Sequence, residues 1–221
     1  MAALQITLLG CGKMGSAMLR GWLADPTLDA NFTIIEPYRE HLGWADAHSR
    51  VVIYSDCQTA MASGAPILRA MPNTPAAIGK GVTALYADHA AADLVPLATQ
   101  LLGTIGAVVA IDDESLMDAV TAVSGSGPAY VFLLAEAMTA AGIAAGLPAA
   151  LATQLAEATV SGAGALIEAA DESPAVLREN VTSKGGTTAA ALAVLMDENG
   201  LTPLIEQAVK AAKARAVALG A

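Results

Sequence analysis

The sequence predicts an α/β domain followed by an all-helical domain. Short apolar runs alternate with helical patterns over the first half of the 221 residues, which is typical of strands joined by helices in a parallel sheet. From residue 113 onward every periodic segment has helical spacing. We therefore expect two domains, residues 1–112 and 113–221, divided near the charged stretch "IDDES", which also offers a helix cap.

The first domain is expected to begin with a strand, a glycine turn and a helix. The run "LQITLLG" is apolar and ends in glycine, and "KMGSAMLRGWLA" after it repeats apolar residues at helical spacing. Further strands are predicted at residues 32–36, 50–55, 67–71, 82–87 and 107–111, with a helix at residues 91–102. This order of elements favours a parallel sheet.

The second domain has prolines near the starts of its predicted helices, where a missing amide costs little. They are Pro128, Pro148, Pro174 and Pro203. The helix predicted at residues 128–145 carries Glu136 as its only charged residue and has no polar face, so it has to be buried on all sides. A homodimer interface would bury it, and a central position in a monomeric bundle is the alternative.

Composition limits the partners and the compartment. The net charge of −10 makes nucleic acid a poor partner. Binding to a phosphate backbone depends on cationic side chains that replace its counterions, and this chain has no excess of such side chains. Two cysteines and no recognisable leader favour a reduced, cytoplasmic protein. The three histidines lack metal-ligand spacing, so no metal is expected. Glu136 lies inside the apolar stretch 129–147 and argues against a membrane span.

A glycine-rich turn follows the first predicted strand. It fits G-x-G-x-x-G between a strand and a helix, where glycines permit a tight turn and a close approach of a pyrophosphate to the helix N-terminus. We therefore predict a dinucleotide site at Gly10, Cys11, Gly12, Lys13, Met14 and Gly15. The thiol of Cys11 is interpreted as a small side chain tolerated in the turn, since no second Cys or His is near it in sequence.

Two residues after the second strand bear on the choice of cofactor. Glu36 lies 21 positions after Gly15, close to where an acidic residue holds a ribose 2′-hydroxyl and favours NAD. Arg39 lies three residues further on and could instead meet the 2′-phosphate of NADP. NADH and NADPH both stay open at this point.

Three further loops join predicted elements. "AMPNTPA" has two prolines that fix the backbone on either side of Asn73 and Thr74. "VSGSGPAYVF" leads a Ser/Gly loop into a helix. "NVTSKGGTTAAAL" places two glycines before a helix predicted to begin near Thr187. The amides of such loops are free to meet a ligand or a neighbouring chain.

In this order, "GCGKMG", "RAMPNTPA", "AVSGSGPAYVF" and "NVTSKGGTTAAAL" resemble the motifs of the pyrroline-5-carboxylate reductase family, over essentially all of residues 1–221. The resemblance implies an oxidoreductase with a Rossmann-like N-terminal domain for NADPH or NADH. It also implies a helical domain that interlocks with its twin in a homodimer, with a decamer as a larger assembly. The implied reaction is hydride transfer to the C=N carbon of 1-pyrroline-5-carboxylate, which yields L-proline in the final step of proline biosynthesis.

The resemblance also implies roles for individual residues. Thr188 would act at the substrate ring nitrogen as the catalytic residue, and amides of the glycine turn would hold the substrate carboxylate. The implied substrate-binding residues are Ser183, Gly185, Gly186, Thr187 and Thr188, and Met71, Pro72 and Asn73 would join the cofactor site. A helix N-terminus suits the carboxylate because it carries partial positive charge. A protonated imine is already electrophilic, so no proton donor is assigned.

The chain departs from the family pattern at two places. Lys184 stands where the family usually has proline, which puts substrate affinity in question. Between Ser55 and Ile67 the family has about forty more residues, and the segment present is barely enough for a parallel crossover. We expect that the natural chain carries such a segment, because a true deletion would expose a sheet edge, remove a wall of the cofactor site and severely weaken activity.

Two other functions compete with the reductase. A dehydrogenase of the 3-hydroxyacid type would need a helix-borne lysine facing its substrate, whereas Lys184 is predicted in a loop. The second competing function is that of a catalytically silent module that binds a dinucleotide. It is considered because a wall of the nicotinamide site is missing. Tight NAD(P)H binding without turnover of any cyclic imine would indicate that module.

Overall fold

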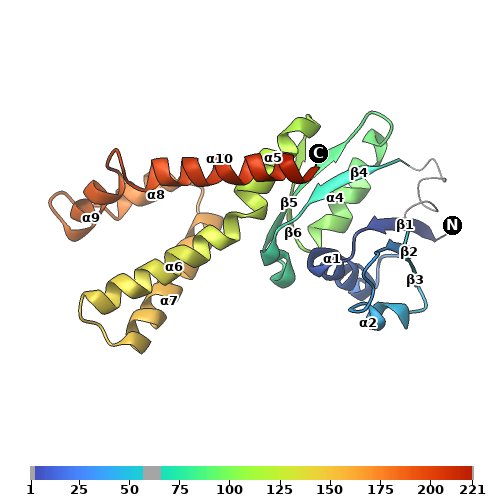
Figure 1. Cartoon of the computed structure of the whole chain (residues 1–221), viewed down its shortest axis with the longest axis horizontal. Helices are drawn as coiled ribbons and strands as arrows, with labels where there is room; N and C mark the ends of the chain where they lie inside the picture. The colour runs from blue at the N-terminus through green and yellow to red at the C-terminus, as the bar shows by residue number, and fades with distance from the viewer. Residues whose placement is uncertain (1–2, 57–65, 221) are drawn as a thin grey trace. The chain divides into compact units, whose positions relative to one another are not determined.

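The computed structural model of the chain describes residues 3–56 and 66–220 (Figure 1). These residues form two compact units, Met1–Val120 and Thr121–Ala221. The first unit is α/β and the second contains only helices, so the predicted fold class is confirmed. The expected extra residues between Ser55 and Ile67 concern a segment of which residues 57–65 lie outside the described part of the chain.

The first sheet of the α/β unit is parallel, as the alternating pattern predicts. It has the order β1 (Leu4–Leu9), β2 (Ala30–Ile35) and β3 (Val51–Tyr54). The helix α1 (Lys13–Ala24) connects β1 to β2, and the short α2 (Gly43–Asp46) lies between β2 and β3. A helical crossover is what parallel neighbours require.

A second three-stranded sheet has the order β4 (Leu68–Met71), β5 (Gly81–Ala87) and β6 (Gly106–Ile111). The strands β5 and β6 are parallel and joined through α4 (Val95–Gly103), but β4 runs antiparallel to β5. The parallel arrangement predicted from the first three strands is therefore confirmed for β1, β2 and β3 and does not extend to β4. Only nine residues separate β4 from β5, including the 3-10 turn η1 (Thr74–Ile78), which is too short for a parallel crossover.

The core of the α/β unit lies between the first sheet and α1. Leu19, Phe32 and Ile34 are fully buried, and the rings of Trp22 and Phe32 stack with centroids 5.8 Å apart. The indole Nε1 of Trp22 donates to the carbonyl oxygen of Leu101 at 2.8 Å. The helices α1 and α4 are therefore tied together by a hydrogen bond as well as by apolar packing.

The predicted cap at "IDDES" is present. The Asp113 carboxylate accepts from the Ser115 amide at 2.8 Å and begins the 3-10 turn η3 (Glu114–Leu116), which leads into α5 (Met117–Val120). The helical unit begins with the π-helical turn η4 (Thr121–Gly125), and the Tyr130 hydroxyl donates to the Ala122 carbonyl at 3.0 Å.

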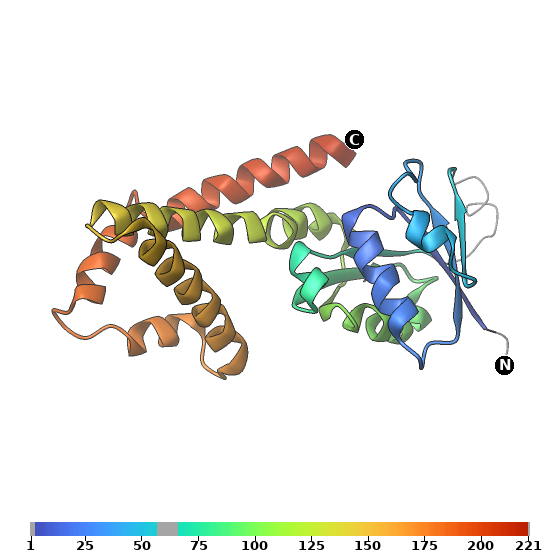
Figure 2. The same ribbon diagram turned by 90° about the horizontal axis from the view of Figure 1, so that it is seen from below.

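The helical unit pairs α6 (Gly127–Ala144) with α7 (Ala149–Ala169) as a hairpin, which Figure 2 shows from below. The chain continues through α8 (Pro174–Asn180), α9 (Thr187–Leu195) and α10 (Leu201–Gly220). No residue of α6 is buried, and large apolar side chains such as Phe132 and Leu133 are more than 60% exposed. Within a single chain, α6 is therefore not the central helix of a bundle.

Candidate dinucleotide site

The glycine turn has the backbone geometry that its sequence predicts. Gly10 has a φ of +86°, which disfavours any residue with a side chain. The first helical hydrogen bond of α1 runs from the Ser16 amide to the Gly12 carbonyl at 2.9 Å, so the preceding amides have no intrahelical partner. A Cβ on Gly15 would collide with the Gly10 carbonyl, so glycine there allows strand and helix to pack closely.

Glu36 holds this turn in place through backbone hydrogen bonds. It is 8% exposed, and its Oε2 accepts from the Cys11 amide at 2.7 Å. Its Oε1 accepts from the Tyr38 amide at 3.0 Å. Each carboxylate oxygen has a second lone pair available for a hydroxyl donor. Glu36 is therefore fixed at the turn and keeps the capacity to accept hydrogen bonds.

These hydrogen bonds make the turn sensitive to acid. The amides of Tyr38 and Cys11 hold the pKa of Glu36 below its ordinary value of 4.5, and nearby His41 acts in the same direction. A carboxylate whose pKa falls on folding stabilises the fold above its unfolded pKa, and this stabilisation is lost as the pH falls through the folded pKa.

We therefore expect Glu36→Gln to lower Tm most at pH 7, with a difference from the unmodified chain that shrinks below pH 4.5. Thermal unfolding followed by circular dichroism at a series of pH values measures it. The exposed Glu40 on the same loop supplies a matched control, Glu40→Gln, which should change Tm little because surface substitutions usually have small effects. A Glu36→Gln difference that is equal at every pH would contradict the assigned role.

His41 is a residue of this site that the sequence analysis did not single out. Its Nε2 lies 2.8 Å from the Cys11 carbonyl oxygen, and that carbonyl also accepts from the Ser16 hydroxyl at 3.0 Å. A carbonyl only accepts, so Nε2 carries the proton. The N–H and C=O groups of Cys11 are thus both held by residues of the loop after β2. Sequence spacing contains no signal for this contact, because 30 positions separate the two residues.

Arg39 is directed to a different partner. Its guanidinium lies 3.5 Å from the Asp46 carboxylate, and both side chains are well exposed. Ion pairs of this kind contribute about 0–1 kcal/mol, so Arg39 is easily released to another anion. The structure places Glu36, and not Arg39, against the glycine turn.

The Cys11 thiol is unsuited to nucleophilic chemistry. Its side chain is fully buried, and burial raises its pKa above the ordinary value of 9.0, with a further increase from the charge of Glu36. The thiolate is the reactive form, so a raised pKa leaves the sulfur inert near neutral pH. The geometry supports the interpretation of Cys11 as a small packing residue.

The loop after β4 borders the same space as the glycine turn. A cavity of about 510 Å³ is lined by Gly10, Met14 and Gly15 from the turn and by Pro72 from the loop. Met71 ends β4, and the Asn73 carboxamide oxygen accepts from the Val82 amide at 2.9 Å, which fixes the loop to the start of β5. Two segments predicted for the cofactor site are therefore brought together.

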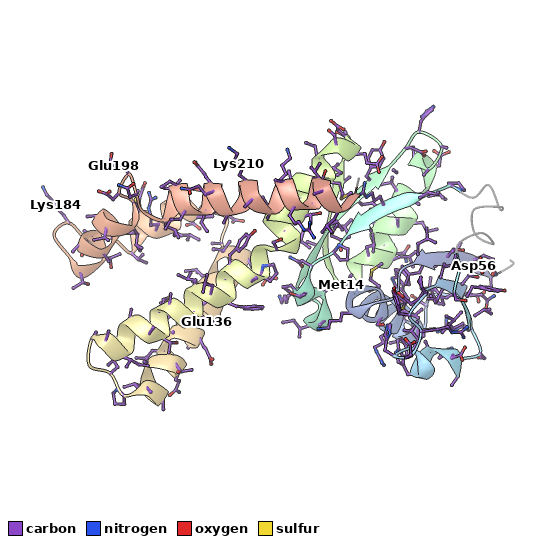
Figure 3. The ribbon with its side chains drawn as sticks, in the orientation of Figure 1. Met14, Asp56, Glu136, Lys184, Glu198 and Lys210 are labelled. Atoms are coloured by element: carbon purple, nitrogen blue, oxygen red, sulfur yellow. The ribbon has the colours of Figure 1, made fainter. Side chains whose placement is uncertain are left out.

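The predicted substrate residues lie on the turn between α8 and α9 in the helical unit. The Gly186 amide donates to the Ser183 carbonyl at 3.0 Å, and Gly185 has a φ of +75°, so Ser183 to Gly186 form a tight turn. Gly186 is the N-cap of α9, which begins at Thr187, as the sequence predicts. Figure 3 shows Lys184 on this turn, with its side chain directed outward.

The start of α9 has no side-chain cap. Its first helical hydrogen bond runs from the Ala190 amide to the Gly186 carbonyl at 3.2 Å, so the amides of Thr187 and Thr188 have no intrahelical acceptor. This arrangement suits a carboxylate ligand. Over residues 3–56 and 66–220, no cluster of three or more potential metal ligands is present.

Comparison with known proteins identifies relatives over both units. The family "Pyrroline-5-carboxylate reductase dimerisation" matches residues 114–219. A pyrroline-5-carboxylate reductase of Synechocystis sp. is 48% identical over 155 residues, which cover 70% of this chain and 57% of the relative. The chain thus spans a little over half the length of such curated relatives.

Solved structures share the fold over nearly the whole chain. A pyrroline-5-carboxylate reductase of Coxiella burnetii superposes with a TM-score of 0.83 at 27% identity, covering 99% of both chains. A Plasmodium falciparum pyrroline carboxylate reductase, solved with NADP bound, has a TM-score of 0.70 at 24% identity and covers 99% of this chain and 100% of its own. The latter likeness concerns the fold alone.

Fold and site together define a class of protein in which a Rossmann-like unit with a glycine turn precedes a helical dimerisation unit. The sequence and the fold of this chain are similar to those of pyrroline-5-carboxylate reductases. The resemblance inferred from four sequence motifs is thereby confirmed.

Proposed function

We propose that this chain reduces 1-pyrroline-5-carboxylate to L-proline with NADH or NADPH. The observation that carries the proposal is the pre-formed glycine turn, held by Glu36 and His41, in a chain similar to pyrroline-5-carboxylate reductases. The bound cofactor would supply a hydride to the C=N carbon of the protonated imine, whose ring nitrogen would keep its proton and become a secondary amine. The chain's own task is to bind and align both molecules and to exclude water.

The cofactor would be held by the α/β unit. The amides at the start of α1 suit its pyrophosphate, and Gly10, Gly12 and Gly15 let the backbone approach closely. Glu36 would accept from the adenosine ribose hydroxyls, while Pro72 borders the neighbouring space and Met71 and Asn73 flank it in the chain. The same turn includes Cys11, Lys13 and Met14. Arg39, three residues after Glu36, would serve as the cation for NADPH once released from Asp46.

The substrate would be held by the helical unit. Ser183, Gly185, Gly186 and Thr187 form the turn and helix start that suit its carboxylate, and Thr188 would bond near the ring nitrogen. We propose the division at residues 1–112 and 113–221 as the functional one. The first part would hold the cofactor, and the second would hold the substrate and the partner subunit.

Loss of nicotinamide absorbance on mixing the purified chain with 1-pyrroline-5-carboxylate tests this function, in parallel with NADH and NADPH. Turnover that requires the imine supports the reductase. Cofactor binding without turnover would indicate the catalytically silent module, and no cofactor binding at all would overturn the proposal. A linear amino acid without the C=N bond serves as the substrate control.

Glu36 should favour NADH over NADPH. A 2′-phosphate would stand against a carboxylate that backbone hydrogen bonds hold ionised, and like charges at close range repel strongly. We expect Glu36→Gln to raise the ratio of NADPH to NADH turnover about tenfold. Steady-state kinetics with both cofactors measures the ratio, and Glu40→Gln should leave it unchanged. An unchanged ratio in Glu36→Gln would mean that another residue sets the preference between NADH and NADPH.

The exposed apolar surface of α6 fits a second copy of this chain. Val131, Phe132, Leu133 and Leu134 are all 45% exposed or more, within the segment that matches the dimerisation family. By length and composition the helical stretch Glu114–Ala144 would also be able to cross a membrane. We propose a cytoplasmic homodimer, with a decamer as the larger assembly, in which the partner covers this surface.

Phe132→Glu should therefore shift the chain from dimer to monomer, because it would place an unpaired charge in an apolar interface. Light scattering after size-exclusion chromatography measures the mass, and we expect dimer affinity to fall about a hundredfold or more. Glu136→Gln on the same helix is the control and should leave the dimer intact. A Phe132→Glu chain that stays dimeric would place the interface on another face.

A further inference from the structure

The amides of the glycine turn differ in whether they have a partner inside the protein. The Gly10 amide donates to the Ile35 carbonyl oxygen at 2.9 Å. The Cys11 amide donates to the Glu36 carboxylate at 2.7 Å. The Gly12 amide comes next, lies on an exposed residue and has no acceptor among the residues that the structure describes. It is therefore the first amide of the turn that can donate to a ligand.

The direction of the Gly12 N–H is set by the carbonyl group of Cys11. The two groups belong to one planar, trans peptide unit, so they point in opposite directions. The Cys11 carbonyl oxygen accepts from the His41 ring at 2.8 Å and from the Ser16 hydroxyl at 3.0 Å. A carbonyl oxygen has two lone pairs, so both are used here. Rotation of the peptide unit would break these bonds, and the Gly12 N–H is thereby held pointing away from the two donors.

The two donors fix this carbonyl to different parts of the α/β unit. Ser16 lies on α1, five positions after Cys11, so its bond stays within one segment of the chain. His41 lies 30 positions away, on the loop after β2. The Leu42 amide donates to the Arg39 carbonyl at 2.9 Å, and the Leu42 side chain is fully buried, which fixes the position of His41 between them. His41 is thus the donor that ties the peptide unit to the loop after β2.

We propose that His41 is a positioning residue for the pyrophosphate of NADH and NADPH, an inference that rests on the proposed reductase function. Its Nε2–H holds the peptide unit between Cys11 and Gly12, so that the Gly12 N–H is directed to the pyrophosphate before the cofactor arrives. A turn that is ordered in advance lowers the free-energy cost of binding. Hydrogen bonds in a chain also polarise one another, so the bond at the carbonyl strengthens the N–H donor of the same peptide unit.

A direct ionic role of His41 would have a different consequence. An imidazolium placed against the 2′-phosphate would act on NADPH alone, because NADH lacks that phosphate. The bond to the Cys11 carbonyl acts through the pyrophosphate, which both cofactors contain. His41 should therefore support the binding of NADH and NADPH equally. This separates its role from that of Glu36, whose replacement is expected to change the ratio of the two.

Replacement of His41 by methionine and by glutamine tests the proposal on the whole chain. The two side chains are unbranched and similar in length, but only glutamine has an N–H donor at its end. We expect His41→Met to raise the Kd of NADH and of NADPH by the same factor, about five- to tenfold, as for the loss of one hydrogen bond. His41→Gln should restore both affinities to within about twofold. Fluorescence titration measures each Kd, and His89→Met, at an exposed histidine in the turn after β5, is the control.

Kinetics and NMR separate positioning from a general loss of structure. His41→Met should raise KM for both cofactors with little change in kcat, because the bond acts on cofactor binding. In the cofactor-free chain, the ¹⁵N resonance of Gly12 should move in His41→Met and return in His41→Gln, because the bond at the carbonyl polarises this peptide unit. A resonance that does not move would overturn the proposal. The same spectra show whether each variant is folded.

The titrations distinguish failure of this proposal from failure of the reductase function. Native affinity of His41→Met for both cofactors would overturn the role of His41 and leave the reductase function standing. A loss confined to NADPH would also overturn it, since that result indicates an ionic contact with the 2′-phosphate. So would an absence of rescue by glutamine, which would assign the effect to the ring and not to its N–H. Failure of the unmodified chain to bind either cofactor would overturn the reductase function itself.

Discussion

Replacing Gly12 by alanine is expected to weaken NADH and NADPH binding about a hundredfold or more while leaving the fold intact. A Cβ built on Gly12 meets nothing within 4 Å, and its φ of −64° is allowed for alanine. The unliganded protein therefore has room for the methyl group. The pyrophosphate does not, because it has to approach the backbone at this position.

Two other glycine variants give this experiment its controls. Gly43→Ala also has open space around the new methyl group, but it lies in α2 and not in the turn, so both stability and binding should be retained. Gly15→Ala would force the methyl group onto the Gly10 carbonyl and should lower Tm as well as binding. Cofactor fluorescence titration and thermal unfolding measure the two effects. Gly12→Ala with native affinity would exclude the turn as the pyrophosphate site.

Replacing Thr188 by alanine is expected to lower kcat/KM for imine reduction about a hundredfold, with NAD(P)H affinity nearly unchanged. The proposed role of Thr188 is a hydrogen bond near the ring nitrogen, where charge changes as the hydride arrives. The nitrogen lone pair that forms in this step can accept from the Thr188 hydroxyl, and the loss of one such transition-state hydrogen bond has an effect of this size in other enzymes. Thr188 lies in the first turn of α9, directly after the glycine turn.

A conservative variant and a distant one complete the Thr188 test. Thr188→Ser keeps the hydroxyl and should recover most of the activity, whereas a purely packing role would not be rescued by serine. Thr182→Ala removes a hydroxyl that bonds the Arg178 carbonyl at 2.6 Å and should affect stability more than turnover. Steady-state kinetics and cofactor titration separate the two quantities. Equal loss of imine reduction and cofactor binding in Thr188→Ala would contradict the assigned pocket.

Local sequence patterns predicted much of this fold and part of the site. The glycine turn, the helix that starts at Thr187 and the cap at Asp113 all depend on neighbouring residues. Glycine conformations, caps and apolar periodicity are properties of short segments, so they can be interpreted without knowledge of the fold. The order of strands and helices could be predicted for the same reason.

Other features depend on residues far apart in the chain. The antiparallel direction of β4 follows from its short connection to β5. This direction could be predicted only once β5 was known to be the strand that pairs with β4. Likewise, the contact of His41 with Cys11 spans 30 positions and has no periodic signature. The free edges of β1 and β4 could be recognised only once the pairing of every described strand was known.

The sequence by itself determined the α/β-then-helical order of the chain, its glycine turns and its family resemblance, because each is encoded in residues that are neighbours along the chain. Only the tertiary structure decided that Glu36 and His41 together hold both backbone groups of Cys11, and that β1 and β4 border one cavity. Hydrogen bonds and edge pairing are set by distance in space, and sequence separation does not reveal that distance.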